Sequence, residues 1–144
     1  MKKAIRFVLM AVVLVIMAAS CKKSSIISGR WELVHVHVYD DNNYAQPIET
    51  WRPADQGMRT YYEFLSNGVL LRTEVSNLGY GVTESRGTWN VDGDILIITF
   101  AAGRTVYTID TANLTDLILF YDYNELGKRY HEVTTFTRAS SSDL

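Results

Sequence analysis

The sequence predicts an all-β domain, folded as an antiparallel up-and-down barrel of eight strands. Apolar and polar residues alternate through most of the chain after Ile27, which is the period of a half-buried strand. Turn residues recur at short intervals, and no stretch after residue 20 keeps a helical period over three turns. Short links favour sequential antiparallel pairing, and closing the sheet removes its two bare edges. A β-sandwich is the alternative, because strand spacing alone does not separate the two.

Eight segments carry the alternation, and residues that suit turns join most of the neighbours. The second and third segments meet at Ser66-Asn67-Gly68, where asparagine and glycine tolerate the positive φ of a tight hairpin. Asp92-Gly93 and Ala101-Ala102-Gly103 make the next hairpin turns, and Asn124-Glu125-Leu126-Gly127 makes the last. We expect the strands at Arg30–Tyr39, Arg59–Leu65, Val69–Val75, Thr83–Val91, Ile95–Phe100, Arg104–Asp110, Leu117–Tyr123 and Arg129–Arg138.

One link is long, the 19 residues from Asp40 to Met58. A link of this length in a compact domain is usually a functional or a mobile loop. It contains Trp51, which we expect to cap the mouth of the barrel.

Residues 1–20 have the parts of a secretory signal peptide. Lys2, Lys3 and Arg6 form a basic start, and an uncharged run of 13 residues follows, from Phe7 to Ala19. A membrane-spanning helix needs about 20 apolar residues, so this run is too short to remain as an anchor.

Ala18-Ala19-Ser20-Cys21 resembles the lipobox of bacterial lipoproteins. The resemblance implies cleavage before Cys21, a diacylglyceryl group on its sulfur and acylation of the new amino terminus by a chain such as palmitate. Two or more chains hold a protein stably on a membrane. Residues 21–28 are then the lipidated cysteine and a tether, residues 29–138 the barrel and residues 139–144 a polar tail. The residue after Cys21 is not aspartate, which by analogy implies the outer membrane, facing the periplasm; display on the cell surface is the alternative.

The composition excludes several functions. The net charge of -2 and the pI near 5.9 argue against a nucleic-acid partner, which requires a basic face. A single cysteine excludes an intrachain disulfide and a cysteine-based zinc site. The sequence has no Gly-x-Ser-x-Gly turn and no phosphate-binding glycine loop, so we expect neither an enzyme nor a cofactor. Four strand glutamates, expected to pair with arginines, are the remaining candidates: Glu63, Glu74, Glu84 and Glu132.

Gly29-Arg30-Trp31 resembles the Gly-x-Trp signature of the lipocalins. In that family the tryptophan plugs the closed end of the barrel, and an arginine at the end of the last strand packs across it. The resemblance implies these structural roles for Gly29, Trp31 and Arg138. It also implies that the long link from Asp40 to Met58 is the lid that lipocalins carry after their first strand.

More specifically, the chain resembles the short lipocalin-like lipoproteins of Bacteroidetes-type bacteria. The resemblance is carried by the start from Ile27 to Leu33, by Phe64-Leu65-Ser66-Asn67-Gly68 and by Gly87-Thr88-Trp89-Asn90. We expect a monomeric binding module that takes a small amphipathic or hydrophobic ligand. The alternative is a non-enzymatic interaction module with a packed barrel that binds another envelope protein.

Aromatic residues on the strands are the candidates for the ligand cavity. Most aromatic side chains in such strands pack in the core, but an eight-stranded barrel is also wide enough for one small ligand. Tyrosine hydroxyls at intervals would suit an amphipathic guest. The candidates are Tyr62, Phe64, Trp89, Tyr107, Tyr121 and Tyr123, with Trp51 at the mouth.

The three histidines suggest a weaker hypothesis. His35 and His37 share one face of their strand, and closure of the barrel would bring His131 near them. Three imidazoles could hold zinc with an open fourth position. Solvent exposure explains them better, because the valines of the same strand make its other face more apolar. A bulge between Trp31 and His35 would let both Trp31 and those valines face inward.

Overall fold

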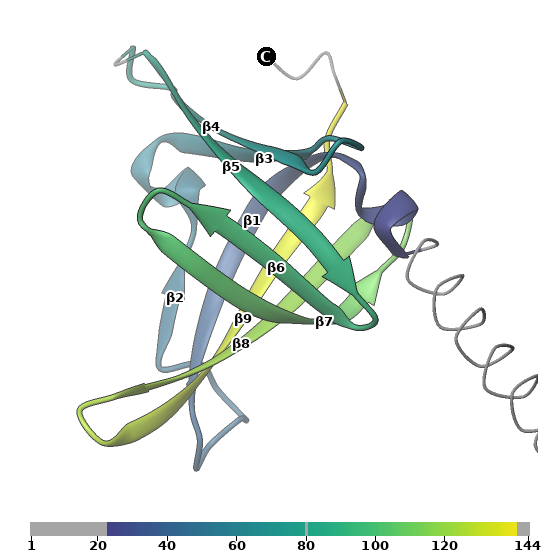
Figure 1. Cartoon of the computed structure of the whole chain (residues 1–144). Coiled ribbons are helices and arrows are strands. Elements are labelled where there is room, and N and C mark those ends of the chain that lie inside the picture. Colours follow the sequence, from purple (N-terminus) through teal and green to yellow (C-terminus); the bar gives the residue numbers. More distant parts are fainter. Residues whose placement is uncertain (1–22, 80, 141–144) are drawn as a thin grey trace, which may run out of the picture.

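The computed structural model describes residues 23–79 and 81–140, which form a closed β-barrel (Figure 1). A helical turn over residues 23–27 precedes the barrel. A short 3₁₀ helix, η1, covers Pro53–Gln56. The described strands are β1 (Gly29–Asp40), β2 (Glu49–Trp51), β3 (Met58–Phe64), β4 (Val69–Ser76), β5 (Val82–Asp92), β6 (Ile95–Phe100), β7 (Gly103–Ala112), β8 (Asp116–Glu125) and β9 (Lys128–Arg138).

Pairing between the first and last strands closes the sheet. From β3 to β9, each strand pairs antiparallel with the next along the chain, and β3 pairs with β1. β9 then pairs with β1, from Trp31 opposite Arg138 to Asp40 opposite Tyr130. The predicted up-and-down barrel of eight strands is therefore confirmed, and the sandwich alternative is wrong.

A bulge in β1 sets which side chains face inward. The register between β1 and β9 shifts between Leu33 and His35, where the sequence predicts a bulge. The extra residue inverts the alternation of the strand. Trp31 before the bulge and Val36 and Val38 after it consequently all face the interior.

The long link contains two elements that the sequence did not predict. Strand β2 pairs with the second half of β1, placing Trp51 opposite Val36 and Glu49 opposite Val38. Helix η1 follows it and packs against β1 and β3. Three residues are too few to display a period of two, so the sequence pattern gives no sign of this strand. The segment expected to be a loop is thus partly an additional edge of the barrel wall.

The two ends of the barrel are built differently. The end beside the helical turn, here called the closed end, is filled by apolar side chains. Its core comprises Ile27, Trp31, Leu33, Phe64, Leu70, Trp89, Val91, Leu96, Ile98, Ile109, Leu117, Leu119 and Phe136.

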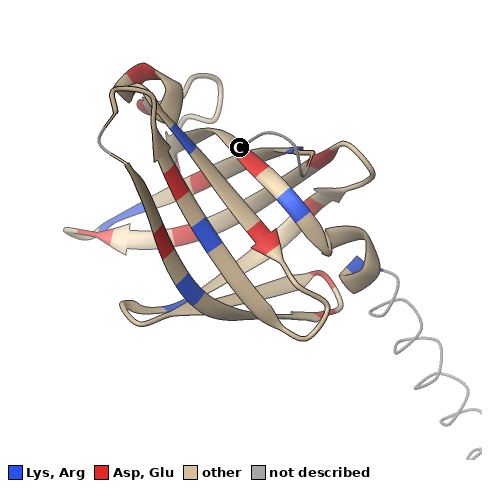
Figure 2. Ribbon diagram, turned by 90° about the horizontal axis from the view of Figure 1, so that it is seen from above, with Lys and Arg blue, Asp and Glu red and all other residues tan. Residues whose placement is uncertain are grey.

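The opposite end, here called the open end, is surrounded by the hairpins β4–β5, β6–β7 and β8–β9 (Figure 1). Charged residues of both signs are spread over the strands (Figure 2).

The anchoring segment lies outside the described residues, so residues 1–20 and Cys21 remain expectations from the sequence. Within residues 23–79 and 81–140, no helix is long and apolar enough to cross a membrane.

Candidate ligand-binding site

Trp31 and Arg138 close one end of the barrel. Trp31 is fully buried, and its indole Nε1 donates to the carbonyl of Ile27 at 2.7 Å. The guanidinium carbon of Arg138 lies 3.8 Å from the centre of the Trp31 ring. The same guanidinium donates to the carbonyls of Ser28 at 2.8 Å and Ile26 at 2.6 Å, while partial burial lowers the pKa of Arg138. The first and last strands and the helical turn are thereby tied together.

Gly29 leaves room for this arrangement. Its φ is +117°, a conformation that side chains with a Cβ rarely adopt. A Cβ at this position would lie 2.6 Å from Nη1 of Arg138. Gly29 and Trp31 of the Gly-x-Trp motif therefore both lie against the guanidinium group of Arg138.

Two of the residues expected to line a cavity are part of the packed core instead. Phe64 is 1% and Trp89 7% exposed, and their rings meet edge to face at 5.3 Å. The Trp89 indole donates to the carbonyl of Leu65 at 2.9 Å. Both side chains point into the barrel, as the alternation of their strands predicts. They lie at the closed end, however, where core side chains fill the interior.

The interior becomes polar beyond that core. Arg72 and Glu74, both on β4, form an ion pair. Tyr62 and Tyr107 are largely buried near this pair, and burial raises the pKa of each hydroxyl, so both remain neutral donors. Thr60 Oγ1 and Arg72 Nε are buried with no hydrogen-bond partner in the described part of the chain. Unsatisfied groups of this kind are uncommon in proteins and are expected where a ligand or water binds.

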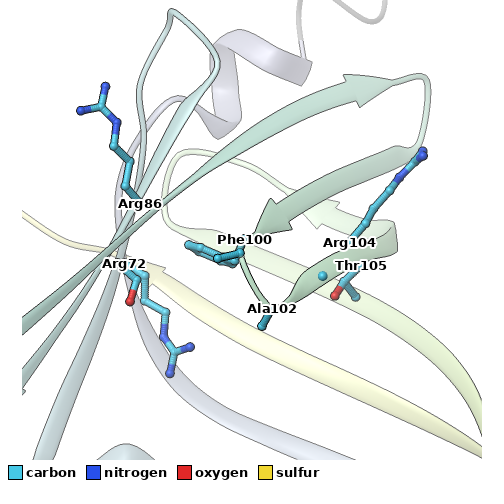
Figure 3. A pocket seen from close by; sticks show the side chains of 9 residues that line it. Arg72, Arg86, Phe100, Ala102, Arg104 and Thr105 are labelled. Atoms are coloured by element: carbon cyan, nitrogen blue, oxygen red, sulfur yellow. The ribbon is translucent and has the colours of Figure 1, made fainter.

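A cavity of about 650 Å³ opens through the wall between β5 and the β6–β7 hairpin. The gap exists because β5 pairs with β6 only from Thr88 onward, which leaves residues 82–87 without a partner on that side. Phe100 and Arg72 line the cavity. Figure 3 shows Phe100 between Arg86 and Arg104, whose guanidinium groups are directed away from it.

A second cavity, of about 360 Å³, lies at the open end and is here called the mouth pocket. Four neighbouring strands form it, in the order β2, β1, β9, β8. Its lining is Val36, Val38, Glu49, Trp51, Tyr123 and Glu132.

Glu132 is the most deeply placed acid of the mouth pocket. Its carboxylate accepts a hydrogen bond from Thr134 Oγ1 at 3.1 Å. Burial raises the pKa of Glu132, and this effect exceeds the opposing effect of the hydrogen bond. The titratable groups that face it from other strands are those of Glu49 on β2, Tyr62 on β3, Tyr107 on β7 and Tyr121 and Tyr123 on β8.

Tyrosines connect the mouth pocket with the deeper interior. The ring centres of Tyr107 and Tyr121 are 5.8 Å apart, those of Tyr121 and Tyr123 5.7 Å, and those of Tyr123 and Tyr130 5.4 Å. The structure thus brings Tyr107, Tyr121 and Tyr123 together, and of these three expected cavity residues Tyr123 lines the mouth pocket. Trp51 lies in the same pocket, on β2 rather than on a free loop.

The histidines lie on the outer face of the barrel. The rings of His35 and His37 stack at 4.1 Å, and burial lowers the pKa of His35. His131 bonds through Nδ1 to the carboxylate of Asp122 instead of joining them. Within residues 23–79 and 81–140, no three His, Cys, Asp or Glu side chains are grouped to hold a metal. The structure does not assemble the zinc site.

Strand alternation separates the four candidate glutamates. Glu74 and Glu132 face the interior, whereas Glu63 and Glu84 occupy outward positions of β3 and β5. Of the expected ion pairs with strand arginines, Arg72–Glu74 is present, while Arg59 pairs with Glu32. No sequence pattern marks Glu49, because its place in the mouth pocket depends on the pairing of strand β2 with β1.

Comparisons with known proteins identify the fold. The sequence matches the family model described as a lipocalin-like domain over residues 27–119. Lobster apocrustacyanin A1 superposes with a TM-score of 0.53 at 15% identity, covering 88% of this chain and 68% of that chain. Apocrustacyanin C2 gives a TM-score of 0.53 at 16% identity, with the same coverage. A bovine odorant binding protein in complex with a selenium-containing odorant gives 0.46 at 13% identity, covering 83% and 74%. No curated protein matches the sequence.

Proposed function

Because this chain belongs to the lipocalin-like domain family, we propose that its barrel binds one small amphipathic or hydrophobic molecule at the open end. The observation that best supports this proposal is the difference between the two ends of the barrel. Side chains fill the closed end, whereas the open end has cavities of about 650 and 360 Å³. Both volumes lie within the range of about 300–1,000 Å³ usual for ligand pockets. An eight-stranded barrel of this family suits one small ligand.

Binding is passive in this proposal. The barrel removes the apolar part of the guest from water, which contributes about 25 cal/mol for each Å² of apolar surface buried. The rings of Tyr62 and Tyr107 border the path of this apolar part, and their hydroxyls, whose pKa burial raises, offer hydrogen bonds along that path. Trp51 forms one wall at the mouth and changes its surroundings when the guest enters.

Native mass spectrometry of the gently purified protein tests this function. We expect a co-purifying small molecule with the parent, and its loss with the double variant Tyr123→Ala/Trp51→Ala, which removes both aromatic side chains of the mouth pocket. The matched control is Tyr44→Ala, which removes an exposed tyrosine outside both cavities. An empty parent protein that instead crosslinks to an envelope protein would favour the interaction module.

The site of the lipid anchor sets the orientation of the barrel. Ile27 is buried in the closed end, the carbonyl of Ile26 binds Arg138, and Lys23 pairs with Asp94. Cys21 precedes Lys23 by two residues, a span of at most about 7 Å. A lipid on Cys21 therefore holds the closed end toward the membrane, and the open end faces the aqueous space, in our proposal the periplasm.

Metabolic labelling with a palmitate analogue tests the anchor. We expect label on the parent and none on Cys21→Ala, with the parent in the outer-membrane fraction. Resistance to protease added to intact cells supports the periplasmic face, and digestion by that protease would favour surface display.

A further inference from the structure

The mouth pocket has aromatic walls on both of its sides. Trp51 stands on β2 and Tyr123 on β8, at the two margins of four consecutive strands. Val36 and Val38 form the apolar floor between them. A cation placed over the faces of such rings is attracted to them, most strongly over tryptophan.

Two carboxylates complete this aromatic pocket. Val38 pairs with Glu49 on β2 and with Glu132 on β9, so the two acids flank Val38 on the same side of the sheet. Strands in a sheet are about 4.8 Å apart, which places the two glutamate backbones about 10 Å from each other. A small organic group fits between their side chains.

The described residues supply no positive charge to these acids. In the described part of the chain, no Lys, Arg or His nitrogen is within ion-pairing distance of either Glu49 or Glu132. Arg52, next to Trp51, pairs with Asp55 outside the pocket. Deeper in the barrel, Arg72 is already held by Glu74. The open half of the interior is therefore net negative, and the half-buried carboxylate of Glu132 lacks a counter-ion among the described residues, which is costly.

We infer that the mouth pocket binds the ammonium group of an amphipathic ligand, between Glu49 and Glu132 and against the faces of Trp51 and Tyr123. This inference rests on the proposed function and specifies its ligand. The bound cation supplies the charge that the two carboxylates lack, and the apolar part of the ligand extends along the tyrosines toward the packed core. Aromatic walls favour an alkylated or aryl ammonium over a bare metal ion, which would require a cage of oxygen atoms.

A series of probes with one apolar chain and three head groups tests the inference. The full lipid-anchored chain in nanodiscs is titrated with octyltrimethylammonium, octyl sulfate and octyl glucoside, and binding is followed by tryptophan fluorescence. Trp51→Phe identifies the signal that arises at the pocket. We expect the ammonium probe to bind about tenfold or more tightly than the neutral one, because its quaternary nitrogen gains ion pairing with the carboxylates and cation–π contact with the two rings.

Charge-neutralising variants locate the effect. Glu132→Gln should weaken the ammonium probe about tenfold, and Glu49→Gln about threefold because Glu49 is more exposed. Both variants should leave octyl glucoside unchanged. Glu84→Gln is the matched control, since Glu84 is exposed on the outer side of β5 and should change neither. Glu49 is itself exposed, so its variant keeps the test valid should Glu132→Gln fold poorly.

The outcomes separate the two levels of the proposal. Equal binding of the three probes, or tightest binding of octyl sulfate, overturns the ammonium assignment and leaves the ligand-binding function in place. Binding of none of the three overturns the ligand-binding function itself. An ammonium preference that survives both glutamine variants also overturns the assignment.

Discussion

Replacing Arg138 by alanine should destabilise the barrel without weakening ligand binding. The change removes two part-buried hydrogen bonds, to the carbonyls of Ser28 at 2.8 Å and Ile26 at 2.6 Å, and a cation–π contact with Trp31 at 3.8 Å. It also removes an exposed, longer hydrogen bond to the carbonyl of Leu114 at 3.3 Å, which adds little to the loss. Charged hydrogen bonds contribute about 1.5–3 kcal/mol each, and a partly exposed cation–π contact about 0.5–1 kcal/mol. Arg138 is only partly buried, so the lower values apply, and we expect a loss of about 3 kcal/mol.

Urea denaturation measures that loss as a change in the free energy of unfolding. In a domain of this size it corresponds to a fall of about 10 °C in Tm. Arg104→Ala serves as the control, because Arg104 is exposed on β7, and its cost should stay below about 0.5 kcal/mol. Arg138→Lys should recover only part of the loss. The planar guanidinium of arginine binds the two carbonyls through two separate nitrogens, whereas lysine has a single nitrogen. An unchanged unfolding energy in Arg138→Ala, or weaker ligand binding at an unchanged Tm, would refute the assignment of Arg138 to the closed end.

Three further predictions follow from single positions. Gly29→Ala should cost more than about 1 kcal/mol in thermal unfolding, because its Cβ would lie 2.6 Å from Nη1 of Arg138 at a φ of +117°. Wild-type stability in Gly29→Ala would contradict that geometry. Burial raises the pKa of Glu132 above its unfolded value, so the stability that this group contributes is fully present below the unfolded pKa and is lost as pH rises through the folded pKa. Glu132→Gln should therefore be more stable than the parent at neutral pH and no more stable in acid, and a pH-independent difference in Tm would speak against this. Thr60→Val should be neutral or stabilising by about 1 kcal/mol in ligand-free protein, because the buried Oγ1 has no partner in the described structure; a clear loss in urea unfolding would reveal a partner.

The alternation of apolar and polar residues was sufficient to place the eight barrel strands. The bulge in β1 followed only with the further expectation, from the resemblance, that Trp31 faces inward. The observed β7, for example, extends the predicted Arg104–Asp110 by one or two residues at each end. Local patterns specify these features because a strand exposes alternate faces and a tight turn demands particular residues. The contact of Gly29 and Trp31 with Arg138 could be predicted only from the resemblance to lipocalins, because it joins residues far apart in the sequence.

The depth of a side chain along the barrel axis could not be read from alternation. Phe64 and Tyr62 share one face of β3, yet the first is packed at the closed end and the second lies toward the polar interior. The mouth pocket depends even more on tertiary structure, because Glu49 and Trp51 enter it only when three residues of the long link pair with β1.

The sequence by itself therefore determined the eight strands of the barrel, though not β2, and the turns between them. Only the tertiary structure decided which buried positions are filled by neighbours and which border open space. The physical reason is that alternation is a property of one strand, whereas a cavity is the volume that side chains from several strands leave between them.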